Sequence, residues 1–176
     1  MKLEWGLTAG NAEGEVDRLL AVSRKAEGGL PLTETQARAV AQAHSEALRR
    51  TGRIEFGKSA AEKLVEIFAG SPWLTREEQG QQLAELAALF YDCRAELPDS
   101  LPDGWLLEQM RRAFDGPCRG CMELMNDCFL LQLPRHLRQG GRPEDFGWRR
   151  AAFFPKQINK KRRSNRRLGL KKVRGS

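Results

Sequence analysis

The stretch that decides the fold is residues 33–70, TETQARAVAQAHSEALRRTGRIEFGKSAAEKLVEIFAG. Thr33 and Gln36 form a T-x-x-Q capping signature, and strong helix formers follow with apolar residues at helical spacing. Gly52 then ends this pattern, since glycine commonly terminates helices. The stretch therefore predicts a helix over residues 33–50.

Two more capping signatures lie downstream. An S-x-x-E box at Ser59 and Glu62 opens AAEKLVEIFAG, which predicts a second helix. A third box, Thr75 with Glu78, begins the longest apolar pattern in the chain, which Pro98 ends. Three such signatures at the starts of three apolar patterns favour a helical protein.

The remaining patterns extend the same fold. LPDGWLLEQMRRAFDG predicts a helix ending near Phe114, and a further helix is expected from about Arg119 to Leu133, where Pro134 must break or kink it. EGEVDRLLAVSRKAE, near the N-terminus, predicts one more helix. The short segment RIEF is too short to form a strand without a partner. We therefore expect an all-α fold, a compact irregular bundle of five to six helices over residues 1–141.

Charge divides the chain into two parts. Residues 1–134 carry 15 Lys and Arg against 21 Asp and Glu, whereas residues 135–176 carry 15 against 2. The formal net charge of +7 is therefore a property of the C-terminal part. Residues 142–176 are expected to form a basic, flexible extension, because beyond Pro155 they offer little apolar surface to bury.

The extension carries the strongest functional signal. From Arg149 to Ser176 there are 12 Lys and Arg residues and no acid. A one-sign charge density of this kind suits a phosphate backbone. We therefore predict a nucleic-acid-binding module, RNA or DNA undecided. The predicted contacts are Arg149, Arg150, Lys160, Lys161, Arg162, Arg163, Arg166, Arg167, Lys171, Lys172 and Arg174.

Other interpretations of the extension stay open. A charge run is often only a solvated tail, and anionic lipid is a further competitor. The basic segment could also fold onto the acidic body, and the aromatic residues Phe146, Trp148, Phe153 and Phe154 could dock there. A second hypothesis, from a different functional class, is a protein-interaction module that acts through its helical body, with the tail incidental.

Four motifs in order also resemble a known family. They are GRIEFG, EKLVEIFAGSPWLT, LAALFYDCRAEL and RRAFDG, and the resemblance thins toward Leu137. The chain is similar here to an uncharacterised bacterial family, a domain of unknown function. The resemblance implies a compact, mainly helical cytoplasmic domain, and it implies no activity.

The cysteines allow three interpretations, of which a C-x-x-C redox pair at a helix start is the least favoured because no βαβ pattern surrounds it. Cys118 and Cys121 have C-x-x-C spacing, and with Cys128 and either His136 or Cys93 they make a chemically possible zinc site. The alternative, which we favour, places Cys121 and Cys128 on one helical stripe as small core residues. In that case Cys118→Ser is expected to be nearly silent. No cofactor is expected.

No motif supports catalysis. Phosphate-loop, dinucleotide-binding and H-E-x-x-H patterns do not occur, and His44 is predicted to be a surface residue with no partner that would make it a general base. In GRIEFG, Gly52 and Gly57 are expected to form a helix cap and a tight turn, while Ile54 and Phe56 pack two helices together. A ligand-contacting loop is the alternative interpretation of this segment. We therefore expect a non-enzymatic protein.

The expected location is the cytoplasm. The N-terminus lacks the apolar run of a signal peptide, and no window approaches 18 consecutive apolar residues. The four cysteines are then expected to be reduced thiols rather than a disulfide framework.

Overall fold

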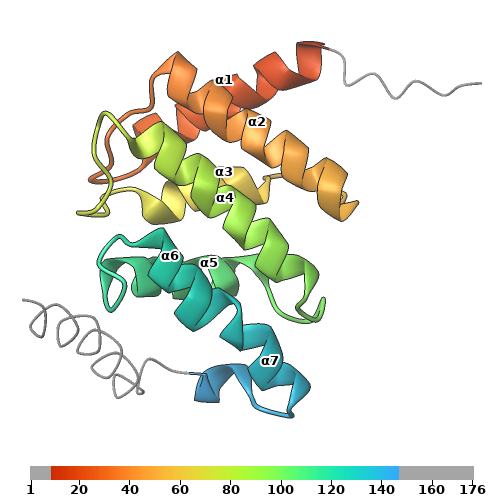
Figure 1. The fold of residues 1–176 in the computed structure, drawn as a ribbon. Helices are drawn as coiled ribbons and strands as arrows, with labels where there is room; N and C mark the ends of the chain where they lie inside the picture. The colour runs from red at the N-terminus through yellow and green to blue at the C-terminus, as the bar shows by residue number, and fades with distance from the viewer. Residues whose placement is uncertain (1–8, 147–176) are drawn as a thin grey trace, which may run out of the picture.

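The computed structural model describes residues 9–146, and every element in this range is helical (Figure 1). No strand occurs in the described range, so the predicted all-α class is confirmed. The helices from α1 to α5 each have nine residues or more, and α6, η1 and α7 form one interrupted rod. The elements are α1 (Ala9–Lys25), α2 (Glu34–Thr51), α3 (Ala60–Phe68), α4 (Gln79–Ala95), α5 (Asp103–Asp115), α6 (Met122–Met125), the π-helical turn η1 (Asn126–Leu130), α7 (Gln132–Arg138) and the 3-10 turn η2 (Pro143–Asp145).

The capping signatures form the hydrogen bonds that the sequence predicts. Thr33 Oγ1 accepts from the Gln36 N–H at 3.2 Å, and Gln36 Oε1 accepts from the Thr33 N–H at 3.0 Å. Ser59 Oγ likewise accepts from the Glu62 N–H at 3.1 Å. These bonds supply partners for N–H groups that the first helical turn leaves unpaired. Both predicted caps are therefore confirmed. At the third box the bond to Thr75 Oγ1 also forms, but α4 begins only at Gln79.

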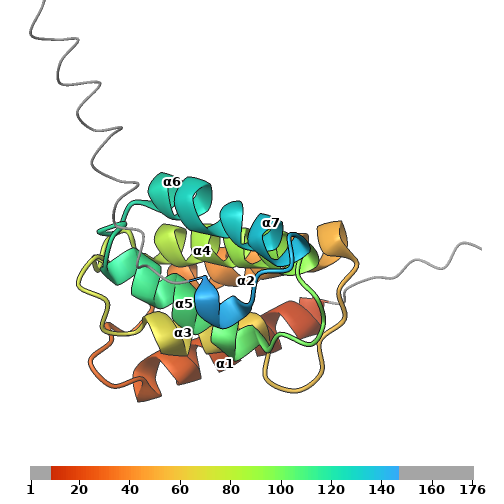
Figure 2. The same cartoon turned by 90° about the horizontal axis from the view of Figure 1, so that it is seen from below.

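Helix α4 lies at the centre of the bundle and packs most extensively on α2 (Figures 1 and 2). The two helices approach closely at Gly80, where a Cβ atom would lie 2.7 Å from Gln36 Cβ. A side chain at position 80 would therefore push α2 and α4 apart. Further along α4, Phe90 and Tyr91 are both buried and meet edge to face at 5.0 Å.

The rod from α6 to α7 changes helical form just before Pro134. Pro134 has no N–H, so it cannot donate to the Leu130 carbonyl four residues earlier. The Cys93 thiol lies 3.5 Å from that carbonyl oxygen and donates to it instead. The π turn ends at Leu130 and α7 runs from Gln132 to Arg138, so the interruption falls at Leu131 and Pro134 lies within α7, three residues beyond the break.

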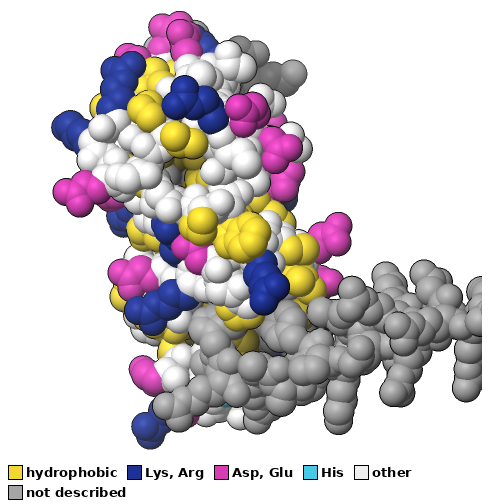
Figure 3. All heavy atoms as spheres, turned by 90° about the vertical axis from the view of Figure 1, so that its left-hand side faces the viewer, with side chains coloured by type: hydrophobic (Ala, Val, Ile, Leu, Met, Phe, Trp, Pro, Cys, Tyr) yellow, Lys and Arg dark blue, Asp and Glu magenta, His cyan; other side chains and the backbone are white. Residues whose placement is uncertain are grey.

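The connecting loops gather at the two ends of the bundle. Loops 26–33, 69–78 and 116–121 lie together on the left of Figure 1, whereas loops 52–59 and 96–102 lie at the opposite end, as Figure 2 also shows. The face seen in Figure 3 mixes Lys and Arg with Asp and Glu, and hydrophobic side chains are exposed between them. That face therefore shows no single-sign charged patch.

Candidate functional site

In the loop that joins α2 to α3, Arg53 and Glu55 face inward, whereas Ile54 and Phe56 face outward. Ile54 is 76% exposed and Phe56 is 90% exposed, whereas the Arg53 and Glu55 side chains are only 25% and 10% exposed. The expectation that Ile54 and Phe56 pack two helices together is therefore wrong. The loop's backbone follows the prediction, since Gly52 caps α2 with φ 68° and Gly57 turns with φ 74°.

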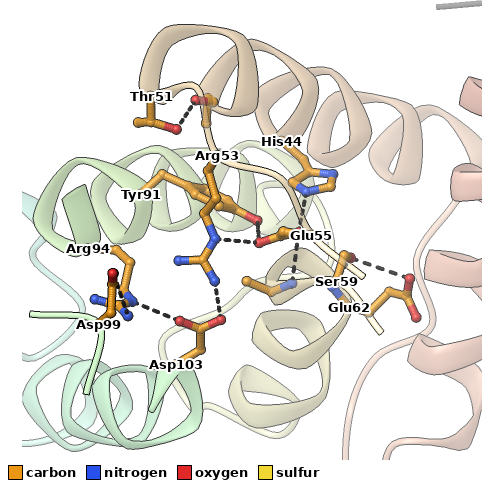
Figure 4. Close-up of polar contacts among 12 residues, drawn as sticks. His44, Thr51, Arg53, Glu55, Ser59, Glu62, Tyr91, Arg94, Asp99 and Asp103 are labelled. Carbon is orange, nitrogen blue, oxygen red and sulfur yellow. Dashed lines mark hydrogen bonds and ion pairs between the residues drawn. The ribbon is translucent and has the colours of Figure 1, made fainter. Parts of the chain in front are cut away.

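Glu55 is the centre of a buried polar cluster (Figure 4). Its Oε1 accepts a hydrogen bond from the Tyr91 hydroxyl at 2.7 Å and lies 3.2 Å from Arg53 Nε. Its Oε2 lies 2.9 Å from His44 Nε2 and accepts from the Ala60 N–H at 3.3 Å. The carboxylate thus ties the loop to α2, to α4 and to the first residue of α3.

His44 joins the cluster from α2, where it is buried rather than on the surface as predicted. Its Nδ1 contacts the Glu15 carboxylate from α1, while its Nε2 faces Glu55. An imidazole with a carboxylate at each nitrogen donates from both, which requires the charged form. His44 therefore links α1 to the loop as a cation.

On the other side of Glu55 the cluster continues to α5. The Arg53 guanidinium pairs with Asp103, the first residue of α5, and stands 5.8 Å from the centre of the Tyr91 ring. The second oxygen of Asp103 accepts from Arg94 Nε at 2.9 Å. Arg94 also donates to the carbonyl oxygens of residues 97 and 98, which closes the C-terminal end of α4.

The charges of this cluster balance. Three carboxylates face three cations, and every side chain among them is at most 25% exposed. Buried charges are tolerated when each is paired and hydrogen-bonded, which holds here. We call these residues the ion-paired cluster: Glu15, His44, Arg53, Glu55, Tyr91, Arg94 and Asp103.

The pKa shifts follow from this pairing. Burial opposes the charged form of His44, but hydrogen bonds to Glu15 and Glu55 outweigh it and raise its pKa to about 9. Burial likewise opposes ionisation of Glu55, yet bonds from His44 and Tyr91 lower its pKa. Burial, together with the Glu55 charge, raises the pKa of Tyr91. At neutral pH, His44 holds both protons and has no lone pair with which to act as a base.

A pocket of about 390 Å³ opens beside the cluster, between loops 52–59 and 96–102. Its two cationic wall residues already have partners in the protein, since Arg53 and Arg94 both bind Asp103. The pocket therefore suits an uncharged side chain better than a free anion. The residues around it are Thr51, Arg53, Ile54, Tyr91, Arg94, Ala95, Leu97 and Asp99. We call Ile54, Phe56 and this pocket the loop surface.

The cysteines and His136 have partners or positions other than those predicted. Cys118 is buried and Cys128 is exposed. The sequence predicts the reverse, with Cys128 in the core and Cys118 at a position where substitution is nearly silent. Burial raises the pKa of the Cys118 thiol to about 11, so it stays protonated at neutral pH. His136 Nε2 lies 3.0 Å from the Arg142 carbonyl oxygen. Among residues 9–146, no group of three His, Cys, Asp or Glu side chains is placed to hold a metal ion.

The residues predicted to contact nucleic acid, from Arg149 to Arg174, all lie outside the described residues, as does most of the extension. Of the aromatic residues expected to dock on the body, Phe146 is described. Its ring lies 5.4 Å from that of Phe129 and 5.2 Å from that of His136. No helix within the described range is long and apolar enough to cross a membrane.

Comparison with protein families gives a match over most of the chain. Residues 19–143 match the model of DUF6323, a family of unknown function. The chain belongs to this family. Neither the curated proteins nor the solved structures gave a match. The resemblance to an uncharacterised domain family is thereby confirmed.

The DUF6323 match includes the loop surface and most of the ion-paired cluster. Glu15 and the basic residues after Arg142 lie outside it. One signal for His44 was present in the sequence, because His44 falls on the same helical stripe as Val40 and Ala47. No comparable signal marks Glu55, whose partners come from α2, α3 and α4.

Proposed function

We propose that this protein is a protein-interaction module whose helical body binds its partner through the loop surface. One observation supports this above all: Phe56 is 90% exposed on a loop whose neighbouring side chains are fixed by the ion-paired cluster. Exposed aromatic side chains in a fixed position are typical anchors of protein interfaces, because little conformational entropy is lost when they bind.

The surroundings of Phe56 indicate the chemistry of the partner. Ile54 lies two residues away at 76% exposure and lines the adjacent pocket. The two arginines of the pocket are already paired with Asp103 within the protein. A partner that inserts an aromatic or aliphatic side chain would cover the apolar pair without breaking those ion pairs. The proposed partner is therefore a protein segment with exposed apolar side chains.

The test places a photoreactive amino acid at position 56 of the full chain in its native cells. The control carries the same group at Gln81, an exposed residue in the first turn of α4, at the other end of the bundle. We expect one defined protein to be linked from position 56 and not from position 81. That protein is then purified for binding measurements with the two matched variants Phe56→Asp and Gln81→Asp.

Truncation of an interface anchor costs about 2 kcal/mol or more, so Phe56→Asp should weaken binding by more than about tenfold. Gln81→Asp should leave the affinity unchanged. Equal affinities for the wild type and Phe56→Asp would rule out the loop surface as the binding site, and so would identical proteins linked from positions 56 and 81.

A second candidate function rests on the extension. The 12 Lys and Arg residues after Gly147, with no acid among them, favour binding of nucleic acid by residues 149–174. If about half of these cations contact phosphates, log affinity should fall with log salt at a slope of about −5 on duplex DNA. An anisotropy titration of the full chain measures this slope, and a flat response would contradict the proposal.

A charge-reversed full chain is the matched variant for this second candidate. Replacing Arg162, Arg163, Arg166 and Arg167 by Glu should abolish nucleic-acid binding and leave binding of the protein partner intact. The two functions can therefore be tested separately in the same molecule.

A further inference from the structure

The described body and the rest of the chain carry opposite charge. Residues 9–146 hold 17 Lys and Arg against 22 Asp and Glu, whereas residues 147–176 hold 12 Lys and Arg and no acid. Two tethered segments of opposite charge attract each other at a high effective concentration, because the linker keeps them together. The net negative charge of the body therefore attracts the chain's own basic C-terminal segment.

The described part of the chain ends at a packed residue. Phe146, the last described residue, is half-buried and packs against Phe129 of η1 and His136 of α7. Helix α7 is in turn joined to the C-terminal end of α4, where Arg138 Nη1 lies 3.3 Å from Glu96 Oε2. Glu96 directly precedes Leu97, which lines the pocket of the loop surface. The chain thus leaves the described body beside a helix that contacts the rim of the pocket.

The next segment of the chain matches the loop surface in chemistry. Residues 148–154, WRRAAFF, place three aromatic side chains and two arginines within seven positions. The loop surface offers the exposed pair Ile54 and Phe56 together with the pocket. At its rim, the Asp99 side chain is fully exposed and lies 4.0 Å from Arg94, which leaves it accessible to a further cation.

We propose that residues 148–154 of the same chain cover the loop surface in the free protein. The aromatic side chains pack on Ile54 and Phe56, and the arginines pair with acids at the rim such as Asp99. Seven residues in extended form span roughly 23 Å, which is the reach available to the segment. This inference rests on the proposed function, because the segment then competes with the partner protein for one site.

The experiment again uses the photoreactive group at position 56, now in purified full-length protein at high dilution. Equal amounts of ¹⁴N- and ¹⁵N-labelled chains are mixed, so that mass spectrometry distinguishes links within a chain from links between chains. We expect the tryptic peptide of residues 151–156, AAFFPK, to be linked to residue 56 of the same chain. The group placed at Gln81 serves as the control and should not link to this peptide.

Two variants sharpen the result. Replacing Phe153 and Phe154 by Ser should lower the yield of the link several-fold and raise the affinity for the partner protein. Replacing Arg162 and Arg163 by Glu should leave the link in place, since these residues lie beyond the proposed segment. A loss of the link in the second variant alone would show that overall charge, and not this segment, covers the surface, and would overturn the proposal.

Three further outcomes would overturn it as well. They are the absence of a link to residues 151–156, a link formed equally from position 81, and links found between chains alone, which would make a second copy the occupant. A failure of this proposal about residues 148–154 is distinguishable from a failure of the proposed function. The partner can require Phe56 even if the segment never covers it, and the link within the chain can form even if no partner protein exists.

Discussion

Helix α4 separates two buried regions that are held together by different forces. Phe90 and Leu86 face an apolar core, to which Phe68 and Phe114 contribute an edge-to-face pair at 5.6 Å. Tyr91, the neighbour of Phe90, belongs instead to the ion-paired cluster. The apolar core gains stability from burial alone, whereas the cluster must offset the desolvation of six charges with well-formed pairs.

The two regions contribute differently to the fold. An apolar core tolerates several packings, whereas buried ion pairs offset their desolvation only when their geometry is good. The cluster therefore fixes the conformation of loop 52–58 and keeps Ile54 and Phe56 outside. Its net contribution to stability is smaller than its number of contacts suggests, but the loss of one member leaves buried charges with fewer partners. Four predictions examine this comparison.

The largest effect is expected for Glu55→Ala. The substitution leaves His44 and Arg53 with one carboxylate partner each and takes the acceptor from the Tyr91 hydroxyl. Breaking a buried ion pair by removing one partner typically costs about 3 to 5 kcal/mol. Urea denaturation measures the change in the free energy of unfolding.

The matched control is Glu66→Ala. Glu66 pairs with Lys58, and both side chains are exposed, with 54% and 42% of their surface accessible. Exposed pairs of this kind contribute about 0 to 1 kcal/mol. Equal losses for the two variants would show that the cluster is no more important than a surface ion pair.

The second prediction concerns pH. The pKa of His44 is raised to about 9 in the folded state, against about 6.5 in an unfolded chain. A raised pKa means that this stabilisation is fully present below pH 6.5 and is lost as the pH rises toward 9. Between pH 6.5 and 8.5 the free energy of unfolding should fall by about 2 to 3 kcal/mol.

Measurements to pH 8.5 stop at about the ordinary pKa of a cysteine thiol, so ionisation of thiols in the unfolded chain adds less to the pH dependence than His44 does. The burial-raised pKa values of Cys93 and Cys118, about 12 and about 11, add their own loss of stability at higher pH. The variant His44→Gln should be less stable at pH 6.5 and show little change with pH over this range. A slope that persists in His44→Gln would assign the pH dependence to another group.

The third prediction reverses the expectation from the sequence for the cysteines. Cys118 is 1% exposed, so Cys118→Ser buries a hydroxyl group and should cost about 1 to 3 kcal/mol. Cys128 is exposed, so Cys128→Ser should change stability by less than about 0.5 kcal/mol. Thermal unfolding of both variants under reducing conditions measures the difference. The opposite ranking would mean that the helical stripe predicted from the sequence is correct.

These cases show which features could be predicted from the sequence. The starts of α2 and α3 follow from local hydrogen bonds at Thr33 and Ser59, which lie three residues from their partners. Gly52 and Pro134 act on the backbone within one helical turn, so their effects were also predictable. Each of these features depends on neighbours in the chain.

The features that sequence reasoning missed depend on distant partners. Alternation in RIEF indicates that two side chains point each way, but it does not indicate which pair is buried. Hydrophobicity alone favours burial of Ile54 and Phe56. Arg53 and Glu55 are buried instead, because Asp103 and Tyr91 lie 50 and 36 residues further along the chain and supply their partners.

The cysteine stripe failed for a different reason, which is helical phase. A continuous α-helix from residue 119 would place Cys121 and Cys128 on one face. In the structure Cys121 precedes α6, and the π turn η1 adds a residue to the turn that follows. Met125 and Phe129 are buried, and Cys128 faces solvent.

The smallest change in stability is expected for Phe56→Ser, which is compared with Glu55→Ala at the neighbouring position. Phe56 is adjacent to Glu55 in the chain but is 90% exposed, so its removal takes little apolar surface out of the core. Stability should change by less than about 0.5 kcal/mol, while Glu55→Ala, one position earlier, costs several. Urea denaturation of the two variants side by side, at equal pH, measures both values.

If Phe56→Ser destabilises the protein as strongly as Glu55→Ala, the phenylalanine is part of the folding core and the loop surface is not free to bind a partner. A near-zero effect would leave binding as the role of this exposed aromatic side chain, which the variant Phe56→Asp then tests against the purified partner.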